Sequence, residues 1–258
     1  MDCGVILKIL FLGYEDNSVL SFLRKENNVF STSKKISLEE ILEIDPELIV
    51  SYGYRYILGS EIVDKFTRKI INLHVSYLPW NRGTYPNVWS IIDNTPSGVS
   101  IHFIDTGVDT GDIIFQKKVE TLSTDTLESS YKRLRCEIEK LFIDNWKKIS
   151  SGDLKGYKVN NVKGTYHSKA RSERFFKKLG IFENWEITVE EVRKKTDEQI
   201  INEIQEIRAR NNTHWMDVVK LAFRLSPDEA REIFKKIKHC DQKINHLLKE
   251  LADNDPEE

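Results

Sequence analysis

The chain has 258 residues, enough for one domain of ordinary size with a smaller companion, and its formal net charge of −2 provides no overall positive field for holding nucleic acid. Cys3, Cys136 and Cys240 lie far apart and form no C-x-x-C pair, which indicates reduced thiols in a cytoplasmic protein. The longest apolar run, Val5 to Leu12, is interrupted by Lys8 and is too short to span a bilayer, so we predict no nucleic-acid partner and no membrane association.

The first fifty residues alternate strand-like and helix-like segments. Gly13 follows the first expected strand without a G-x-G-x-x-G fingerprint, so a nicotinamide or flavin cofactor is not expected. Asn17 and Ser37 are each placed to cap a helix, the second with Glu40 in a capping box. This alternation predicts an α/β fold with a Rossmann-like, mostly parallel sheet, whose first strands are Val5 to Leu12, Val29 to Ser33 and Leu48 to Ser51.

A tyrosine-rich segment follows the third expected strand. Tyr52, Tyr54 and Tyr56 surround Gly53, at the end of the sheet where ligands of open α/β folds bind. These rings can wall a flat slot, or they can be ordinary aromatic residues at the rim of the sheet.

The next strand delivers two polar side chains side by side. Ile70 and Ile71 begin a buried strand that ends with Asn72 and His74, and alternation puts these two side chains on one face. Asp109 lies in a turn from Thr106 to Gly111, after an expected strand from Val99 to Ile104, and its two glycines would let the turn approach a bound molecule closely.

Asn72, His74 and Asp109 form a set suited to acyl transfer between two bound partners. An imidazole accepts a proton near neutral pH, a carboxylate orients it, and a carboxamide donates to a developing oxyanion. The attacking amine would then belong to the substrate. Taken singly, the three residues could also be a turn residue, a core histidine and a loop former.

The remaining elements are an outer strand from Ile113 to Val119 and a long amphipathic helix from Leu127 to Ile149. Lys163 to Lys169 is either a solvated loop or part of an anion site with Arg171. Helical spacing returns from Thr188 to Leu251, where Ser226 caps a helix that begins with Pro227. We expect a catalytic domain at residues 1–150, a connecting segment at 151–187 and a helical region at 188–258, which could dimerise, dock a partner or cover the core.

Four motifs occur in order along the middle of the chain: N-x-H-x-S-x-L-P-x-x-R-G from Asn72, P-x-x-W from Pro86, G-V-x-I-H from Gly98 and D-T-G-D-I from Asp109. Together they resemble the formyltransferases that use formyl-tetrahydrofolate, over roughly Val5 to Val119. The resemblance implies that Asn72 holds the formyl oxygen, His74 moves the proton of the attacking amine and Asp109 orients His74. It also implies N10-formyltetrahydrofolate as donor and no metal.

The same resemblance implies two sets of binding residues. The folate pocket would be lined by Tyr54, Tyr56, Leu58, Ile104 and Asp105. The variant L-P-W-N-R-G-x-x-P-N-x-W, and a later G-x-Y-H segment, are similar to the sugar N-formyltransferases of surface-polysaccharide biosynthesis. Arg82 could meet phosphate oxygens and the aromatic rings could cover a sugar or base, although this stretch could also be a structural loop. The expected acceptor contacts are Trp80, Arg82, Tyr85, Asn87 and Tyr166.

The expected function is formyl transfer to the amino group of a nucleotide-linked amino-deoxy sugar, such as a dTDP-4-amino-4,6-dideoxyhexose, for O-antigen, lipopolysaccharide or another surface glycan. Formyl transfer to glycinamide ribonucleotide or methionyl-tRNA is an alternative within the same superfamily. A folate-binding or scaffold protein without catalysis is a third hypothesis. The partners would be folate and a nucleotide-linked sugar, with a homodimer possible.

Overall fold

A computed structural model describes residues 6–160, 162–182 and 184–253, with side chains described to residue 247. Cys3 and Val5, named above, lie outside the described residues, as do the side chains of Leu248 and Leu251. The chain divides into two compact units, one ending at Asp197 and one beginning at Glu198. No helix of the described residues is long and apolar enough to cross a membrane.

The first unit is built on a six-stranded sheet with strand order β2-β1-β3-β4-β6-β7. The first four of these are parallel, and β6 and β7 are antiparallel to their neighbours. This confirms the predicted α/β class with a mostly parallel sheet. The strands are β1 (Lys8–Gly13), β2 (Asn28–Thr32), β3 (Leu48–Tyr52), β4 (Ile70–His74), β6 (Gly98–Phe103) and β7 (Ile113–Lys118).

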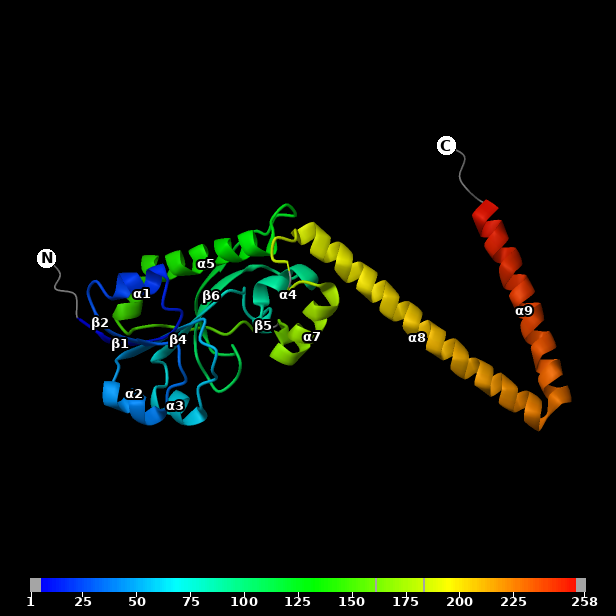
Figure 1. Cartoon of the computed structure of the whole chain (residues 1–258), viewed down its shortest axis with the longest axis horizontal. Helices are drawn as coiled ribbons and strands as arrows, with labels where there is room; N and C mark the ends of the chain where they lie inside the picture. The colour runs from blue at the N-terminus through cyan, green and yellow to red at the C-terminus, as the bar shows by residue number, and fades with distance from the viewer. Residues whose placement is uncertain (1–5, 161, 183, 254–258) are drawn as a thin grey trace. The chain divides into compact units, whose positions relative to one another are not determined.

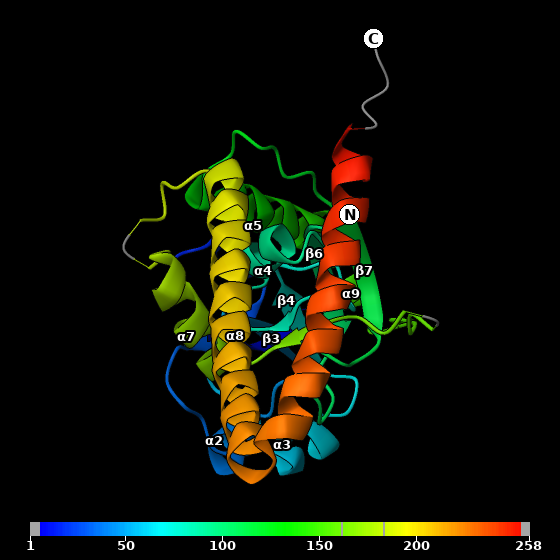
Figure 2. The ribbon, with the colours of Figure 1, turned by 90° about the vertical axis from the view of Figure 1, so that its right-hand side faces the viewer.

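Helices cover both faces of this sheet, which is why its central strands are buried along most of their length. On one face α1 (Ser18–Leu23) and α5 (Leu127–Asp144) contribute Leu20, Leu134 and Ile138 to the main core. On the other face α2 (Leu38–Ile44) and α3 (Ser60–Lys65) pack Ile41 and Ile62 against strand residues. Figures 1 and 2 show the strands between these two helical layers.

The helix caps predicted at Asn17 and Ser37 are present. Asn17 accepts a hydrogen bond from the backbone N–H of Leu20 at 2.8 Å, and Ser37 and Glu40 form the expected capping box. The helix Leu127 to Ile149 was predicted as one piece, but it is interrupted. It ends at Asp144, and α6 (Trp146–Ser150) follows because Asn145 turns its side chain back to the Leu141 carbonyl at 2.8 Å.

The segment after α6 is ordered by long-range pairing. A short strand β8 (Tyr166–His167) pairs in parallel with β5 (Arg82–Gly83), and α7 (Lys169–Leu179) follows. His167 is only 2% exposed and its ring stacks on Trp89, so the solvated-loop interpretation is wrong at this residue, while Lys163, Tyr166 and Lys169 are exposed. Trp89 belongs to α4 (Pro86–Ile92), a helix that the sequence analysis did not predict.

A second apolar cluster joins α4 and α7 to the beginning of α8 (Val189–Leu225). Its buried residues include Trp89, Phe176, Val189 and Val192. The second unit consists of the rest of α8 and α9 (Pro227–Asp253), as the helical spacing predicted. The division into domains at residues 150 and 187 stays a prediction.

Candidate active site

The candidate site lies where β4 ends. In the antiparallel pairing of β4 with β6, Asn72 is opposite His102 and His74 is opposite Ser100. Asp109 reaches the same place from the loop after β6, with a left-handed backbone at φ 51°. Alternation along β4 and the turn after β6 therefore bring together the three residues that the sequence singled out.

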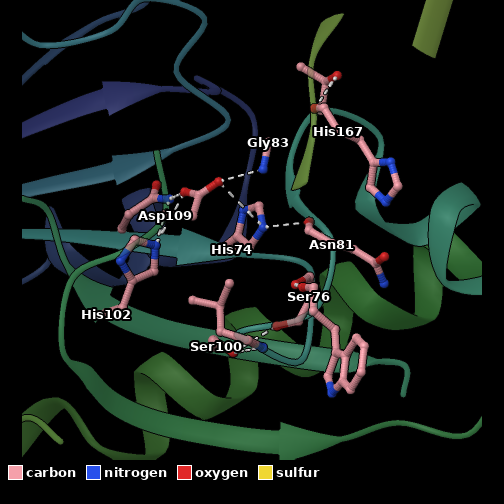
Figure 3. Close-up of polar contacts among 12 residues, drawn as sticks. His74, Ser76, Asn81, Gly83, Ser100, His102, Asp109 and His167 are labelled. Atoms are coloured by element: carbon pink, nitrogen blue, oxygen red, sulfur yellow. Dashed lines mark hydrogen bonds and ion pairs between the residues drawn. The ribbon is translucent and has the colours of Figure 1, made fainter. Parts of the chain in front are cut away.

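Asp109 is the centre of this cluster (Figure 3). Its Oδ2 accepts a hydrogen bond from the Gly83 N–H at 2.9 Å and lies 3.7 Å from Nε2 of His74. Its Oδ1 accepts from the Asn72 Nδ2 at 3.3 Å and lies 3.4 Å from Nε2 of His102. The carboxylate is nearly enclosed, so its contacts with protein groups replace its contacts with water.

Burial and charge set the protonation states. Burial alone would raise the pKa of Asp109, but its interactions with His74, His102 and the Gly83 N–H outweigh burial and hold that pKa well below its usual range. Burial lowers the pKa of His74, and the nearby Asp109 carboxylate only partly opposes this. Although the His74 to Asp109 distance would suit an ion pair, the resting site is best described as an ionised Asp109 beside a neutral His74.

The neighbours of each ring nitrogen fix the tautomers. Nδ1 of His102 is 2.7 Å from the Phe103 carbonyl and must donate to it, so Nε2 is free to accept from Asn72 Nδ2 at 3.2 Å. Nε2 of His74 faces two acceptors, the Asn81 carbonyl at 3.4 Å and the Asp109 carboxylate. Neutral His74 therefore carries its hydrogen on Nε2 and offers Nδ1 as the atom that can accept a proton.

Thr165 and the adjoining strand β8 hold the loop that supplies these backbone groups, and we refer to their hydrogen bonds to this loop as the clamp. Thr165 accepts from the Asn81 N–H at 2.8 Å through its Oγ1, which also donates to Asn81 Oδ1 at 3.0 Å. The Arg82 N–H donates to the Thr165 carbonyl at 3.0 Å and the Thr84 N–H donates to the His167 carbonyl at 3.1 Å. Gly83 lies between them with φ 95°, and a Cβ there would stand 2.3 Å from the His167 carbonyl oxygen.

Of the five residues predicted for the folate pocket, Tyr56 is exposed and the other four are half-buried. Tyr54, Leu58 and Ile104 pack on the same apolar cluster, and the ring of Tyr56 meets that of Tyr54 at 5.4 Å. The carboxylate of Asp105 is used within its own loop, where it accepts from Gly107 N–H at 3.1 Å and Thr110 Oγ1 at 2.6 Å.

Position 111 of that turn requires glycine because of packing against the protein backbone, and not because a ligand approaches it. A Cβ at this position would stand 1.8 Å from the Phe103 carbonyl oxygen. The turn can therefore pack against β6 only with glycine here.

The residues predicted to contact the acceptor fall into two groups. Arg82 and Tyr166 are register partners in the β5–β8 pair, and Tyr166 is 47% exposed. Trp80 is partly buried in the same loop. Tyr85, by contrast, packs on Phe176 and Phe182, and Asn87 is only 3% exposed, with no hydrogen-bond partner for its Nδ2 in the described part of the chain.

Sequence reasoning did not assign His102, Gly83, Asn81 or Thr165 to the site. His102 could have been found from the pairing of β4 with β6, because it then faces Asn72. The other three act through backbone groups or through a partner more than eighty positions away, for which the sequence carries no local signal. Among the described residues no group of three or more His, Cys, Asp or Glu side chains is arranged to hold a metal ion.

Comparison with known proteins agrees with this geometry. A family model described as formyl transferase matches residues 15–145. The crystal structure of the formyltransferase PseJ from Anoxybacillus kamchatkensis, in complex with UDP-4,6-dideoxy-4-formamido-L-AltNAc and tetrahydrofolate, is 39% identical. The similarity covers 73% of this chain and 98% of that one, with a TM-score of 0.67. An N-formyltransferase from Helicobacter canadensis, in complex with folinic acid and dTDP-3-aminofucose, is 25% identical over 64% of this chain and 72% of that one, with a TM-score of 0.52.

Curated relatives with a different substrate also match. Methionyl-tRNA formyltransferase of Desulforamulus reducens is 34% identical over 145 residues, which cover 55% of this chain and 46% of that protein. The chain thus spans about half the length of the curated relatives that it matches. Because the family model covers half of the chain, including every residue of the Asn72, His74 and Asp109 cluster, this chain belongs to the formyl transferase family.

Proposed function

We propose that this protein transfers the formyl group of N10-formyltetrahydrofolate to the amino group of a nucleotide-linked amino sugar. The observation that carries the proposal is the enclosed cluster of Asn72, His74 and Asp109 at the end of β4. The similarity to PseJ, whose structure holds a UDP-linked formamido sugar and tetrahydrofolate, supports the choice of acceptor. A role in surface-glycan biosynthesis, such as that of O-antigen or lipopolysaccharide, in the cytoplasm completes the proposal.

The chain has groups that fit a folate donor. Tyr54, Tyr56 and Leu58 come from the loop after β3 and Ile104 from the end of β6, so apolar and aromatic surface gathers from two strand ends. Asp105 would lie beside it. A bound donor supplies the formyl carbon that the amine of the acceptor attacks.

Each catalytic side chain then has one task. Asn72 donates a hydrogen bond from Nδ2 to the formyl oxygen, exchanging one of its present bonds to Asp109 and His102. His74 would accept the proton of the attacking amine at Nδ1 and return it to the N10 nitrogen of the folate as the bond between that nitrogen and the formyl carbon breaks. Asp109 holds the hydrogen of His74 on Nε2 and stabilises the imidazolium that forms.

The acceptor would lie along β5 and β8. Arg82 is the cationic residue of the loop between β4 and α4, and phosphate oxygens are its natural partners. Tyr166 beside it, with Trp80, offers aromatic surface for the sugar or base. Tyr85 and Asn87 would contact the acceptor from the buried side of this loop, where Asn87 Nδ2 donates to no group among the described residues.

A second candidate acceptor is methionyl-tRNA, because the curated relatives at 34% identity act, by their names, on that substrate. A net charge of −2 offers no general attraction for tRNA. The similarity covers under half of that relative, so it supports formyl transfer as the shared chemistry without supporting the same acceptor.

A panel of acceptors distinguishes these candidates. Purified protein with N10-formyltetrahydrofolate would be offered UDP-linked and dTDP-linked 4-amino and 3-amino sugars, glycinamide ribonucleotide and methionyl-tRNA. Mass spectrometry should show the gain of one formyl group on a nucleotide sugar only. Formylation of methionyl-tRNA or glycinamide ribonucleotide in preference to every sugar would contradict the proposal.

A further inference from the structure

The second unit leaves two rows of apolar side chains exposed. On α8 the row contains Ile204, Ile207, Val218 and Leu221, and on α9 it contains Ile233, Ile237, Ile244 and Leu247. Each of these side chains is between 46 and 62% exposed. Leaving so much aliphatic surface in water is unfavourable, and such surfaces usually mark a site of contact with another protein surface. We refer to the two rows as the α8 seam and the α9 seam.

Both seams have the spacing of a coiled coil. When Asn211 and His214 are included, the residues of the α8 seam are spaced alternately three and four positions apart, from Ile204 to Leu221. When Ala230 and Cys240 are included, the α9 seam has the same spacing from Ala230 to Leu247. This is the heptad pattern that buries one seam of a helix against another helix.

The two seams also match each other in register when the helices run antiparallel. Each seam residue of α8 has a counterpart in the α9 seam. The two residues lie the same number of positions from the junction of Leu225 and Ser226, one before it and one after it. The layers formed in this way pair Val218 with Ile233, His214 with Ile237, Asn211 with Cys240, Ile207 with Ile244, and Ile204 with Leu247, whereas Ala230, the register partner of Leu221, is already buried within its own chain at 4% exposed.

The residues beside the seams are complementary in the same register. Arg208 would face Asp241, and Asp217 would face Lys236. Trp215 would face Phe234, while Arg210 and Lys243 would form a repulsive pair. Flanking charges of this kind select partner and orientation in coiled coils.

The junction keeps the two seams of one chain apart. Ser226 is the only residue between α8 and α9, whereas antiparallel helix hairpins use two to five. Its N–H donates to the Ala222 carbonyl at 2.9 Å and its carbonyl accepts from the Ala230 N–H at 3.0 Å, so Ser226 continues the helical hydrogen bonding on both sides. Phe223 and Phe234 meet beside the junction at 5.4 Å, and beyond them the two helices diverge (Figures 1 and 2).

We propose that the helical end docks a second copy of this chain, with α8 of each copy packed antiparallel along α9 of the other. A second copy is the occupant that supplies both seams in the matching register, with the flanking charges in place. Two such contacts, related by a two-fold axis, cover all the exposed side chains of both seams. The dimer does not depend on the chemistry of the formyltransferase site.

Cysteine cross-linking tests the register and the partner together. In the full chain with Cys3→Ser and Cys136→Ser, Asn211→Cys places a thiol opposite Cys240 in the layer described above. Mild oxidation with oxidised glutathione should give a covalent dimer whose linked peptides contain positions 211 and 240. The control is Ala209→Cys in the same background, which lies off the seam and should give no 209–240 link.

The other results of this experiment would overturn the proposal. A monomer with an internal 211–240 disulfide would show that α9 folds back on its own α8. A dimer linked through two copies of position 211 would show a parallel arrangement.

Light scattering provides a second readout in solution. The wild-type chain should have twice the 30.2 kDa mass of one copy. Ile207→Asp, in the α8 seam, should give the single mass, while Gln205→Asp, off the seam of the same helix, should keep the dimer. A monomeric wild-type chain would overturn the proposal, as would a dimer unchanged by Ile207→Asp.

Discussion

At the scale of single residues, the site depends on a neutral His74 that lies beside an ionised Asp109. Asp109 keeps its charge because the hydrogen on Nε2 of His74 points toward it and because the Gly83 N–H and the Asn72 amide donate hydrogen bonds to its oxygens. His74 loses its charge because it is buried. A neutral base beside a fixed anion is the arrangement that an amine nucleophile needs when it must lose a proton.

This arrangement predicts a specific pH dependence. Burial puts the pKa of His74 below the ordinary value of about 6.5. The kcat/KM should therefore be constant at neutral pH and fall only as the pH drops through that lowered pKa. An acid limb centred above about pH 6.5 would contradict the assignment of His74 as base.

The same shift predicts a change in stability. Below about pH 6.5 the imidazole of the unfolded chain takes up a proton while the folded one stays neutral, so the free energy of unfolding should decrease as the pH falls through this window. His74→Gln should lose part of that decrease. Melting temperatures of both proteins from pH 7.5 down to about 5 measure it, and identical slopes would show that His74 is not shifted.

Arg82 should determine the affinity for the acceptor. Its place in β5 beside Tyr166 lets its guanidinium meet phosphate oxygens, and charge-assisted bonds to phosphate contribute about 1.5–3 kcal/mol. Arg82→Ala should raise the KM for the nucleotide sugar by roughly tenfold to a hundredfold and leave that for the folate nearly unchanged. Exposed Arg174→Ala is the matched control. Equal increases in both KM values would mean that Arg82 only braces the loop.

At the scale of elements, the pairing of β5 with β8 connects the site to a part of the chain beyond the residues that the family model matches. Thr165 and His167 hold the loop from Asn81 to Thr84, and that loop supplies the Asn81 carbonyl and the Gly83 N–H to the catalytic side chains. We therefore infer that Thr165 positions the catalytic groups without touching the substrate.

Thr165→Val tests this positioning role. It removes two hydrogen bonds of Oγ1 to Asn81 at nearly constant side-chain volume, which should lower kcat about tenfold with little change in either KM. Thr165→Ser keeps the hydroxyl and should restore most of kcat. A lowered melting temperature with unchanged kcat would show that the clamp contributes only to stability.

These elements also show what the sequence could predict. The caps at Asn17 and Ser37 involve partners three residues away, so local patterns were sufficient. The cluster of Asn72, His74 and Asp109 was found because two of its members share one strand face. The burial of His167 and the position of His102 depend on pairings between distant strands, which periodicity does not reveal.

At the scale of the whole molecule, the catalytic unit extends well past its motifs. Ile187, Val189 and Val192 are buried against Trp89 and Phe176, so the first turns of α8 complete the core beside the site. A chain ended after Asp197 should be soluble, unfold cooperatively and keep its formyltransferase activity. One ended after Gly180 would lose these apolar side chains and should aggregate, since each buried aliphatic residue contributes about 2–5 kcal/mol.

The truncated proteins can be compared by thermal unfolding and light scattering of the soluble fraction. A stable, active chain ending at Gly180 would show that the cluster around Trp89 is dispensable. Loss of folding on removal of residues 198–258 would show instead that the second unit supports the catalytic one.

The most direct test of the central claim is formyl transfer to a UDP-linked 4-amino sugar, measured side by side with wild-type protein and Asp109→Asn at saturating donor. Asparagine can still accept from the Gly83 N–H but carries no charge, so the fold should survive while the rate falls by about 10²–10⁴. Exposed Asp16→Asn should keep the wild-type rate. The account predicts formylated sugar from the wild-type protein and almost none from Asp109→Asn. Equal rates from the two proteins, or no product on any nucleotide-linked amino sugar, would contradict it.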